Sequence, residues 1–172
     1  MSEWFSTYGF ADVLDQLLIG AYPLDERDVR MLAWAGVERV LNLVQDDEYE
    51  PGQREEVTAA LAAAGIQEQR LELVDYGGLP AETIEHAVQT VLGWMRDGAR
   101  VYLHCRAGWQ RSAAVAAGVV AIVQESDIDE ALEFVQSRKP TARPLGHQRE
   151  DMLNWWQERS GAAVPPAGAD PV

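Results

Sequence analysis

The chain has 172 residues, of which 47% are hydrophobic, and this is enough apolar material for one globular domain with a buried core. The 14 Lys and Arg residues stand against 28 Asp and Glu residues, and the resulting net charge of −14 disfavours nonspecific binding to nucleic acid or to an anionic membrane. No leader peptide is predicted, and no segment approaches the roughly 18 uninterrupted apolar residues of a membrane span. We therefore expect a cytoplasmic protein whose partners include neither nucleic acid nor a membrane.

The predicted elements alternate between helices and strands. Asp25 is a typical N-cap and Gly36 a typical helix stop, so residues 25–35 are predicted to form a helix. A second helix over 51–64 and a strand over 66–74 follow. The next helix ends at Gly98, and its apolar stripe is interpreted as core because the apolar residues recur at helical spacing: Ile84, Ala87, Val88, Val91, Leu92 and Met95.

The second half of the chain continues this alternation. A strand over 100–105 precedes a helix over 113–123, which is apolar almost all round and is therefore expected to be buried. Two packing helices follow, over 126–137 and 146–159. The pattern predicts a single α/β domain over residues 1–160, with a central, mostly parallel sheet covered by helices on both faces. Inward anchors of the last helix are expected at Met152, Leu153 and Trp156, and a flexible tail is expected over 161–172.

The only cysteine of the chain, Cys105, follows a hydrophobic strand and begins a short loop that ends at Arg111, just before a helix. Backbone N–H groups of such a loop, together with the helix N-terminus, form a cradle for a tetrahedral oxyanion and favour the ionised form of the cysteine. The guanidinium of Arg111 suits bidentate binding of phosphate. The alternative is that Cys105 is a buried structural cysteine without a chemical role. The residues expected to bind the phosphate are Arg106, Ala107, Gly108, Trp109, Gln110 and Arg111.

The pattern His-Cys-x-x-Gly-x-x-Arg-Ser, which begins at His104, resembles the signature of cysteine-based protein phosphatases of the compact dual-specificity type, within the protein tyrosine phosphatase superfamily. The resemblance covers roughly residues 15 to 158. It includes an early strand over 17–23, a second strand over 40–44, and an aspartate, Asp75, 30 residues before the cysteine. The resemblance implies a protein tyrosine phosphatase-like fold and a phosphomonoester hydrolase that needs no cofactor and no metal.

The resemblance also implies roles for individual residues. Cys105 is expected to be the nucleophile, and Asp75 the general acid that later activates water. Ser112 is expected to hydrogen-bond the sulfur as it leaves. His104 either orients the loop or the thiolate, or is a core imidazole bonded to a neighbouring carbonyl. Alternatively, Asp75 caps the turn that follows it, and Ser112 is an ordinary serine in the first turn of a helix, where it satisfies a free N–H group. Asp46 and Asp47 are reserve candidates for the acid, although their surroundings are more typical of a solvated loop.

The substrate is expected to be a phosphorylated protein or a small phosphomonoester, with phosphotyrosine first and phosphoserine or phosphothreonine next. Trp109 and Gln110 are not basic, and this disfavours highly charged inositol lipids. Tyr22, Tyr76 and Trp109 are candidates for the rim of the pocket. Two alternatives stay open: a rhodanese-like sulfurtransferase, whose loop is usually one residue shorter, and a phosphate-binding module without turnover. His86 and His147 are expected to be surface residues, and the oligomeric state is left open.

Overall fold

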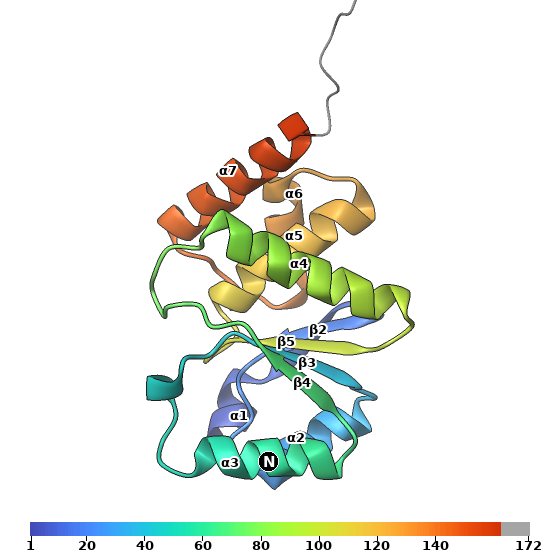
Figure 1. Cartoon of the computed structure of the whole chain (residues 1–172), viewed down its shortest axis with the longest axis vertical. Helices are drawn as coiled ribbons and strands as arrows, with labels where there is room; N and C mark the ends of the chain where they lie inside the picture. Colours follow the sequence, from blue (N-terminus) through green and yellow to red (C-terminus); the bar gives the residue numbers. More distant parts are fainter. Residues whose placement is uncertain (163–172) are drawn as a thin grey trace, which may run out of the picture.

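A computed structural model describes residues 1–162 and contains one sheet of five strands in the order β1-β2-β5-β3-β4 (Figure 1). The edge strand β1 pairs with β2 in the antiparallel sense, whereas β2, β5, β3 and β4 are parallel to one another. The expected mostly parallel sheet is therefore confirmed. The strands are β1 (Phe10–Leu14), β2 (Leu17–Gly20), β3 (Arg39–Asn42), β4 (Gln67–Arg70) and β5 (Val101–His104).

Helices cover both faces of this sheet, as expected (Figure 1). One face carries α1 (Glu3–Tyr8), α2 (Glu26–Trp34) and α3 (Gln53–Ala63). The other carries α4 (Ala81–Arg96), α5 (Arg111–Gln124), α6 (Ile128–Arg138) and α7 (Gly146–Ala162). A short 3₁₀ helix, η1 (Asp46–Glu48), follows β3.

The central strands are buried on both faces, as is typical of parallel strands between two helical layers. Along β5, Val101 and Leu103 join the core beneath α4 and α5, while Tyr102 between them joins the core beneath α2 and α3. The helix α5 is buried along most of its length, which agrees with its apolar sequence. Its N-terminus is thereby fixed against the carboxyl end of β5.

Local signals explain where several helices begin and which face they bury. The Asp25 carboxylate accepts a hydrogen bond from the N–H of Asp28 at 2.9 Å and caps α2, as predicted. Asp127 and Glu130 form a reciprocal capping box at the start of α6. The predicted apolar stripe of α4 lies in the core, with only Met95 partly exposed.

The structure differs from the sequence-based expectations at several element ends. The strand predicted to run to Val74 ends at Arg70, opposite Asn42, where its neighbour β3 also ends. The N–H groups of Leu71 and Leu73 still donate to the carbonyls of Asn42 and Leu43, at 2.9 and 3.1 Å. In α7 the buried aromatic anchor is Trp155, while Trp156 is only partly buried. The same helix continues to Ala162, inside the stretch predicted to be a tail. The remainder of that predicted tail, 163–172, lies outside the described residues.

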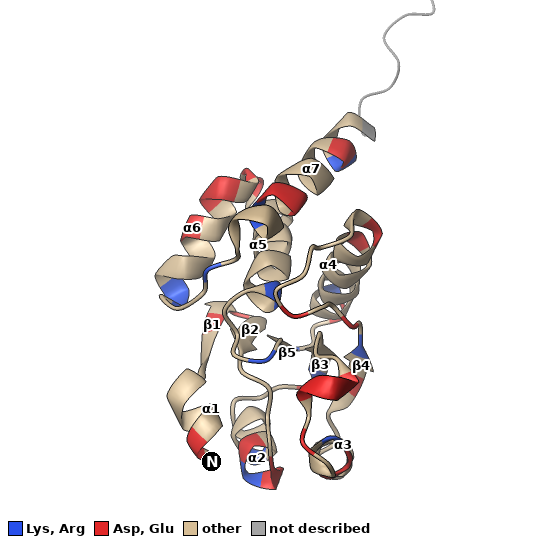
Figure 2. Ribbon diagram, turned by 90° about the vertical axis from the view of Figure 1, so that its left-hand side faces the viewer, with Lys and Arg blue, Asp and Glu red and all other residues tan. Residues whose placement is uncertain are grey.

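The parallel arrangement brings distant segments to one edge of the sheet. Because β2, β5, β3 and β4 run in the same direction, the segments that follow them all emerge at the carboxyl edge. The loop after β5 carries Cys105, η1 follows β3, and Asp75 follows β4. Acidic residues occur on the outer helices, including α2, α6 and α7 (Figure 2). The candidate site therefore lies at the carboxyl edge of the sheet in an otherwise acidic molecule.

Candidate active site

The loop between β5 and α5 is held by direct backbone contacts with the end of β2. Gly108 has φ +74°, in the left-handed region that favours glycine, and a Cβ there would lie 2.6 Å from the carbonyl carbon of Gly20. The backbone N–H of Tyr22 donates to the carbonyl of Arg106 at 3.0 Å. Only a glycine allows this close approach, so the curvature of the loop depends on residue 108.

Cys105 and Ser112 face one another across the loop. The sulfur lies 3.3 Å from the Ser112 hydroxyl oxygen, and both side chains are buried. The first turn of α5, which begins at Arg111, leaves N–H groups without intrahelical partners beside this loop, and such groups can bind the oxygens of an anion. The two residues are therefore in the arrangement expected of a nucleophile and a hydroxyl that can hydrogen-bond its sulfur.

The Arg111 guanidinium is buried, with 1% of its side chain exposed, and it is held by hydrogen bonds to Glu48, Leu73 and Leu43. It donates to both carboxylate oxygens of Glu48 at 2.6 and 2.7 Å, and to the carbonyl of Leu73 at 2.8 Å. Burial alone would lower the pKa of Arg111, but these hydrogen bonds and the negative charges of Cys105, Glu48 and Asp75 raise it. Arg111 is thus a permanent cation with a fixed orientation beside the cysteine.

Glu48 is a site residue that the sequence did not single out. It lies within an acidic run that is typical of a solvated loop. Its partner Arg111 is 63 positions away in the sequence, and only the fold brings the two side chains together. Burial raises the pKa of its carboxyl group, but the hydrogen bonds from Arg111 and from the N–H of Gln45 outweigh burial and lower it. The reserve candidate Asp46 instead pairs with Arg70 at 2.6 Å and is 79% exposed, so its carboxylate faces solvent.

Asp75 lies in the loop between β4 and α4, as its predicted role requires. Its Oδ1 atom is 3.1 Å from a guanidinium nitrogen of Arg111, and 26% of its side chain is exposed. Asp75 lines the same pocket as Cys105. The fold therefore brings the candidate acid, from the loop between β4 and α4, to the candidate nucleophile and the candidate phosphate-binding cation, which both come from the segment between β5 and the start of α5.

The ring of His104 contacts the backbone of the loop, and it lies away from the pocket surface. Its Nδ1 atom is 3.3 Å from the carbonyl oxygen of Cys105, a contact in which the neutral ring donates, and its ring packs 5.6 Å from that of Tyr102. Burial lowers the pKa of His104 to about 3, although the hydrogen bond to Cys105 opposes this shift. The structure therefore shows a neutral, buried imidazole bonded to a neighbouring carbonyl, and this bond also restrains the loop backbone.

The pocket above the loop has a volume of about 200 Å³ and an aromatic wall. Trp4 and Tyr8 of α1, a helix absent from the sequence-based prediction, line it together with Trp109 and Tyr76. The rings of Tyr8 and Trp109 lie 5.4 Å apart. Tyr22, a predicted rim residue, is 4% exposed and does not line the pocket, because it packs between Trp4 and Tyr49.

Arg106 is exposed at the mouth of this pocket, with its guanidinium 5.7 Å from the ring centre of Trp4. Lys139 is buried and donates to the carbonyl of Tyr8 at 2.8 Å. Burial lowers the pKa of Lys139, while the charge of Cys105 opposes this shift. These contacts fix α1 as a wall of the pocket.

Within residues 1–162, no helix combines the length and the apolar character that crossing a membrane requires. The same residues contain no cluster of three or more His, Cys, Asp or Glu side chains that would hold a metal ion.

Comparisons with known proteins agree with this geometry. The family model described as the dual specificity phosphatase catalytic domain matches residues 19–158. A mouse protein named "Phosphatidylglycerophosphatase and protein-tyrosine phosphatase 1" is 31% identical over 120 residues, which are 69% of this chain and 61% of the mouse protein. The match therefore spans about three fifths of the length of that relative.

Solved structures show the same fold. The crystal structure of PTPMT1 superposes with a TM-score of 0.76 at 25% identity, covering 90% of this chain and 98% of the other. The active form of Tk-PTP gives a TM-score of 0.74 at 20% identity, over 87% and 97% of the two chains. The resemblance and the fold class inferred from the sequence are thus confirmed. The chain belongs to the dual specificity phosphatase family, and is a compact member of the protein tyrosine phosphatase superfamily.

Proposed function

We propose that this protein hydrolyses phosphomonoesters through a cysteinyl-phosphate intermediate. One observation carries the proposal: the sulfur of Cys105, the guanidinium of Arg111 and the carboxylate of Asp75 all line one pocket of about 200 Å³. This pocket has room for a phosphate group and the first atoms of its ester. Nucleophile, cation and acid are the three groups that displacement at phosphorus requires.

In the first step the Cys105 thiolate attacks phosphorus, and the bond between phosphorus and the ester oxygen breaks. The leaving oxygen takes the proton of the Asp75 carboxyl group. In the second step water attacks phosphorus, Asp75 takes a proton from that water, and the sulfur–phosphorus bond breaks. Ser112, 3.3 Å from the sulfur, hydrogen-bonds the departing thiolate. The products are the alcohol and inorganic phosphate, and the enzyme regains its starting protonation state.

Arg111 and the loop amides hold the non-reacting phosphate oxygens. Glu48 orients the guanidinium from behind through two hydrogen bonds, and Asp75 approaches it from the pocket side at 3.1 Å. A bound phosphate dianion competes with Asp75 for the pocket side of the guanidinium. Substrate binding therefore frees Asp75 from its ion pair. The freed carboxylate takes a proton from solvent and then faces the ester oxygen as the acid.

The aromatic wall supports aryl phosphates, first of all phosphotyrosine in a phosphorylated protein, as the preferred substrates. Trp4, Tyr8 and Trp109 offer ring surfaces beside the phosphate site, and a phenyl ring packs well against such surfaces. Phosphoserine and phosphothreonine are expected to be poorer substrates, because their short side chains place less surface against this wall.

A second candidate substrate is phosphatidylglycerophosphate, and the 31% identity with a protein whose name includes phosphatidylglycerophosphatase favours it. The net charge of −14 opposes approach to an anionic lipid surface, but Arg106 provides a local cation at the mouth of the pocket. Both candidates require the same chemistry at Cys105, so they differ only in the ester that occupies the outer pocket.

The test compares a phosphotyrosyl peptide, a phosphoseryl peptide and phosphatidylglycerophosphate in detergent, each with wild-type protein, Cys105→Ser and Asp75→Asn. We expect the highest kcat/KM with the phosphotyrosyl peptide and no turnover by Cys105→Ser. Asp75→Asn should lose about 10² or more with this poor leaving group. Full activity of Cys105→Ser would refute the mechanism, and a clear preference for the lipid would replace the first substrate by the second.

A further inference from the structure

The loop over 75–80, called here the acid loop, is held from the start of α7. The Nε2 atom of His147 lies 3.1 Å from the carbonyl oxygens of both Tyr76 and Gly77. The Gln148 amide donates to the Gly77 carbonyl at 3.0 Å. These contacts join residues about 70 positions apart in sequence and lie one and two residues from Asp75.

A third α7 residue continues the same set of contacts. The carboxylate of Asp151 accepts the backbone N–H of Leu79 at 2.7 Å. A Cβ at Gly78 would lie 3.4 Å from the same carboxylate, so the loop backbone runs directly along the helix here. One turn of α7 thus contacts most of the acid loop.

The acid loop has little support of its own. Its internal backbone bond runs from the N–H of Gly77 to the carbonyl of Val74, at 3.0 Å. Tyr76 is 67% exposed and has φ +57°, a left-handed conformation that is unfavourable for a residue other than glycine. Two consecutive glycines follow it. Outside contacts must therefore hold this conformation, and His147 and Gln148 provide them at the carbonyls of Tyr76 and Gly77.

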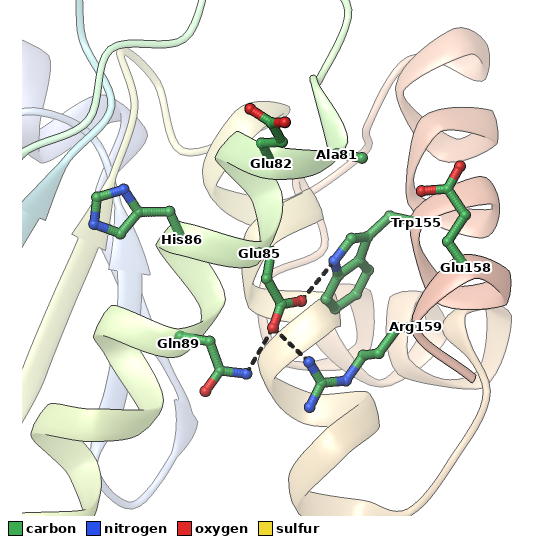
Figure 3. A pocket seen from close by; sticks show the side chains of 8 residues that line it. All are labelled: Ala81, Glu82, Glu85, His86, Gln89, Trp155, Glu158 and Arg159. Atoms are coloured by element: carbon green, nitrogen blue, oxygen red, sulfur yellow. Dashed lines mark hydrogen bonds and ion pairs between the residues drawn. The ribbon is translucent and has the colours of Figure 1, made fainter. Parts of the chain in front are cut away.

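The helix that makes these contacts is itself fixed to the core and to α4. Gln148 is fully buried and also accepts the N–H of Leu145 at 3.1 Å. Further along α7, Trp155 and Arg159 donate to the carboxylate of Glu85 on α4 at 2.8 and 2.6 Å, beside an open groove between the two helices (Figure 3). Because α4 begins at Ala81, directly after the acid loop, both supports of the loop belong to one rigid unit.

We propose that His147 and Gln148 are positioning residues that place the Asp75 carboxyl group for proton transfer. The proposal rests on the proposed role of Asp75 as general acid. Removing either donor lets the acid loop leave the pocket, so that the ester oxygen departs without its proton. Attack by Cys105 is unaffected, because the loop after β5 has no contact with α7 in this set of hydrogen bonds.

The test uses phenyl phosphate, whose leaving group needs a proton, and 4-nitrophenyl phosphate, whose leaving group does not. His147→Leu and Gln148→Met should each lower kcat/KM for phenyl phosphate about tenfold or more, a part of the 10² to 10⁴ that general acids supply. The same variants should change kcat/KM for 4-nitrophenyl phosphate less than about twofold. The comparison uses kcat/KM because it reports the steps up to release of the alcohol and not the later attack of water, in which Asp75 acts for every substrate. His147→Gln, which keeps an N–H donor, should recover most of the lost rate. Arg149→Met is the matched control, because Arg149 lies on the same turn but pairs with Asp129.

The outcomes separate this proposal from the proposed function. If Asp75→Asn shows the leaving-group dependence and both α7 variants do not, the positioning role is wrong and the role of Asp75 stands. If Asp75→Asn shows no such dependence, the assignment of the acid itself fails. A loss that is equal for the two substrates indicates a general folding defect and also overturns the positioning role. His147 is exposed, so its substitution tests the proposal even if Gln148→Met does not fold.

Discussion

The buried ion pair between Arg111 and Glu48 gives a stability prediction for Glu48→Gln. Only 1% of the Arg111 side chain and 7% of the Glu48 side chain are exposed, so water can replace few of the hydrogen bonds that the substitution removes. Each of the two hydrogen bonds to a charged group contributes about 1.5–3 kcal/mol. Glutamine keeps one acceptor, and Asp75 remains 3.1 Å from the guanidinium. We therefore expect the free energy of unfolding to fall by about 3 kcal/mol, at the lower end of the range for breaking a buried pair.

The measurement is urea unfolding of wild type and Glu48→Gln at neutral pH, with thermal unfolding as a second readout. For a chain of this length, about 3 kcal/mol corresponds to a fall in Tm of roughly 6 to 12 °C. Glu26→Gln is the control, because Glu26 and Arg30 form an exposed pair at 3.8 Å. Its loss should stay below about 0.5 kcal/mol. A loss below about 1 kcal/mol for Glu48→Gln would refute the argument.

The pH dependence of the same variant provides an independent check. The pKa of Glu48 is lower in the folded protein than in the unfolded chain, so its contribution is fully present above the unfolded value, about 4.3, and disappears as the pH falls through the folded value. The difference between wild type and Glu48→Gln should therefore shrink in acid. A difference that stays constant from neutral pH to about pH 3 would show that the carboxylate charge is not what stabilises the fold.

Two further predictions concern the nucleophile loop. The pKa of His104 is about 3 in the folded protein, so below about pH 6.5 this residue binds a proton only in the unfolded chain. Between about pH 7 and 5 this proton uptake should lower the free energy of unfolding of the wild type by about 2 kcal/mol. In urea unfolding, His104→Asn should not show this loss. Gly108→Ala should weaken vanadate binding and lower the free energy of unfolding by at least about 2 kcal/mol. The loss of stability should be smaller for the control Gly65→Ala, because residue 65 has a similar φ but no atom lies within 4 Å of the added Cβ. Equal losses in the two alanine variants, measured by urea unfolding, would show that contact with Gly20 does not limit residue 108.

Features that depend on local patterns were predictable from the sequence. The cap at Asp25, the apolar stripe of α4 and the buried helix α5 each leave a signal within a few residues. The grouping of Cys105, Gly108 and Arg111 in one loop is local in the same sense. The predicted alternation of helices and strands was then sufficient to place that loop at the carboxyl edge of a parallel sheet.

Features that depend on distant contacts were not predictable in this way. The helix α1 has only six residues, rich in aromatic and hydroxyl side chains that do not favour a helix, and it is stabilised by contacts such as that of Ser2 with Asp28 at 2.6 Å. Glu48 becomes an active-site residue only because η1 lies beneath Arg111. His147 was expected to be an ordinary surface residue, and its contacts with the acid loop join positions 70 and 71 residues apart.

The contact between Lys139 and the Tyr8 carbonyl spans 131 positions in the chain, so the aromatic wall of the pocket is held in place only after Lys139 has been translated. The helix α1 supplies Trp4 and Tyr8 to this wall, and their anchor is translated much later than they are. Until Lys139 emerges, α1 lacks this bond, although the ring of Trp109, against which Tyr8 packs, has already been translated. A nascent chain that already contains the sulfur and its cradle therefore lacks one side of its substrate cleft. Maturation of this enzyme should accordingly be a late, long-range event.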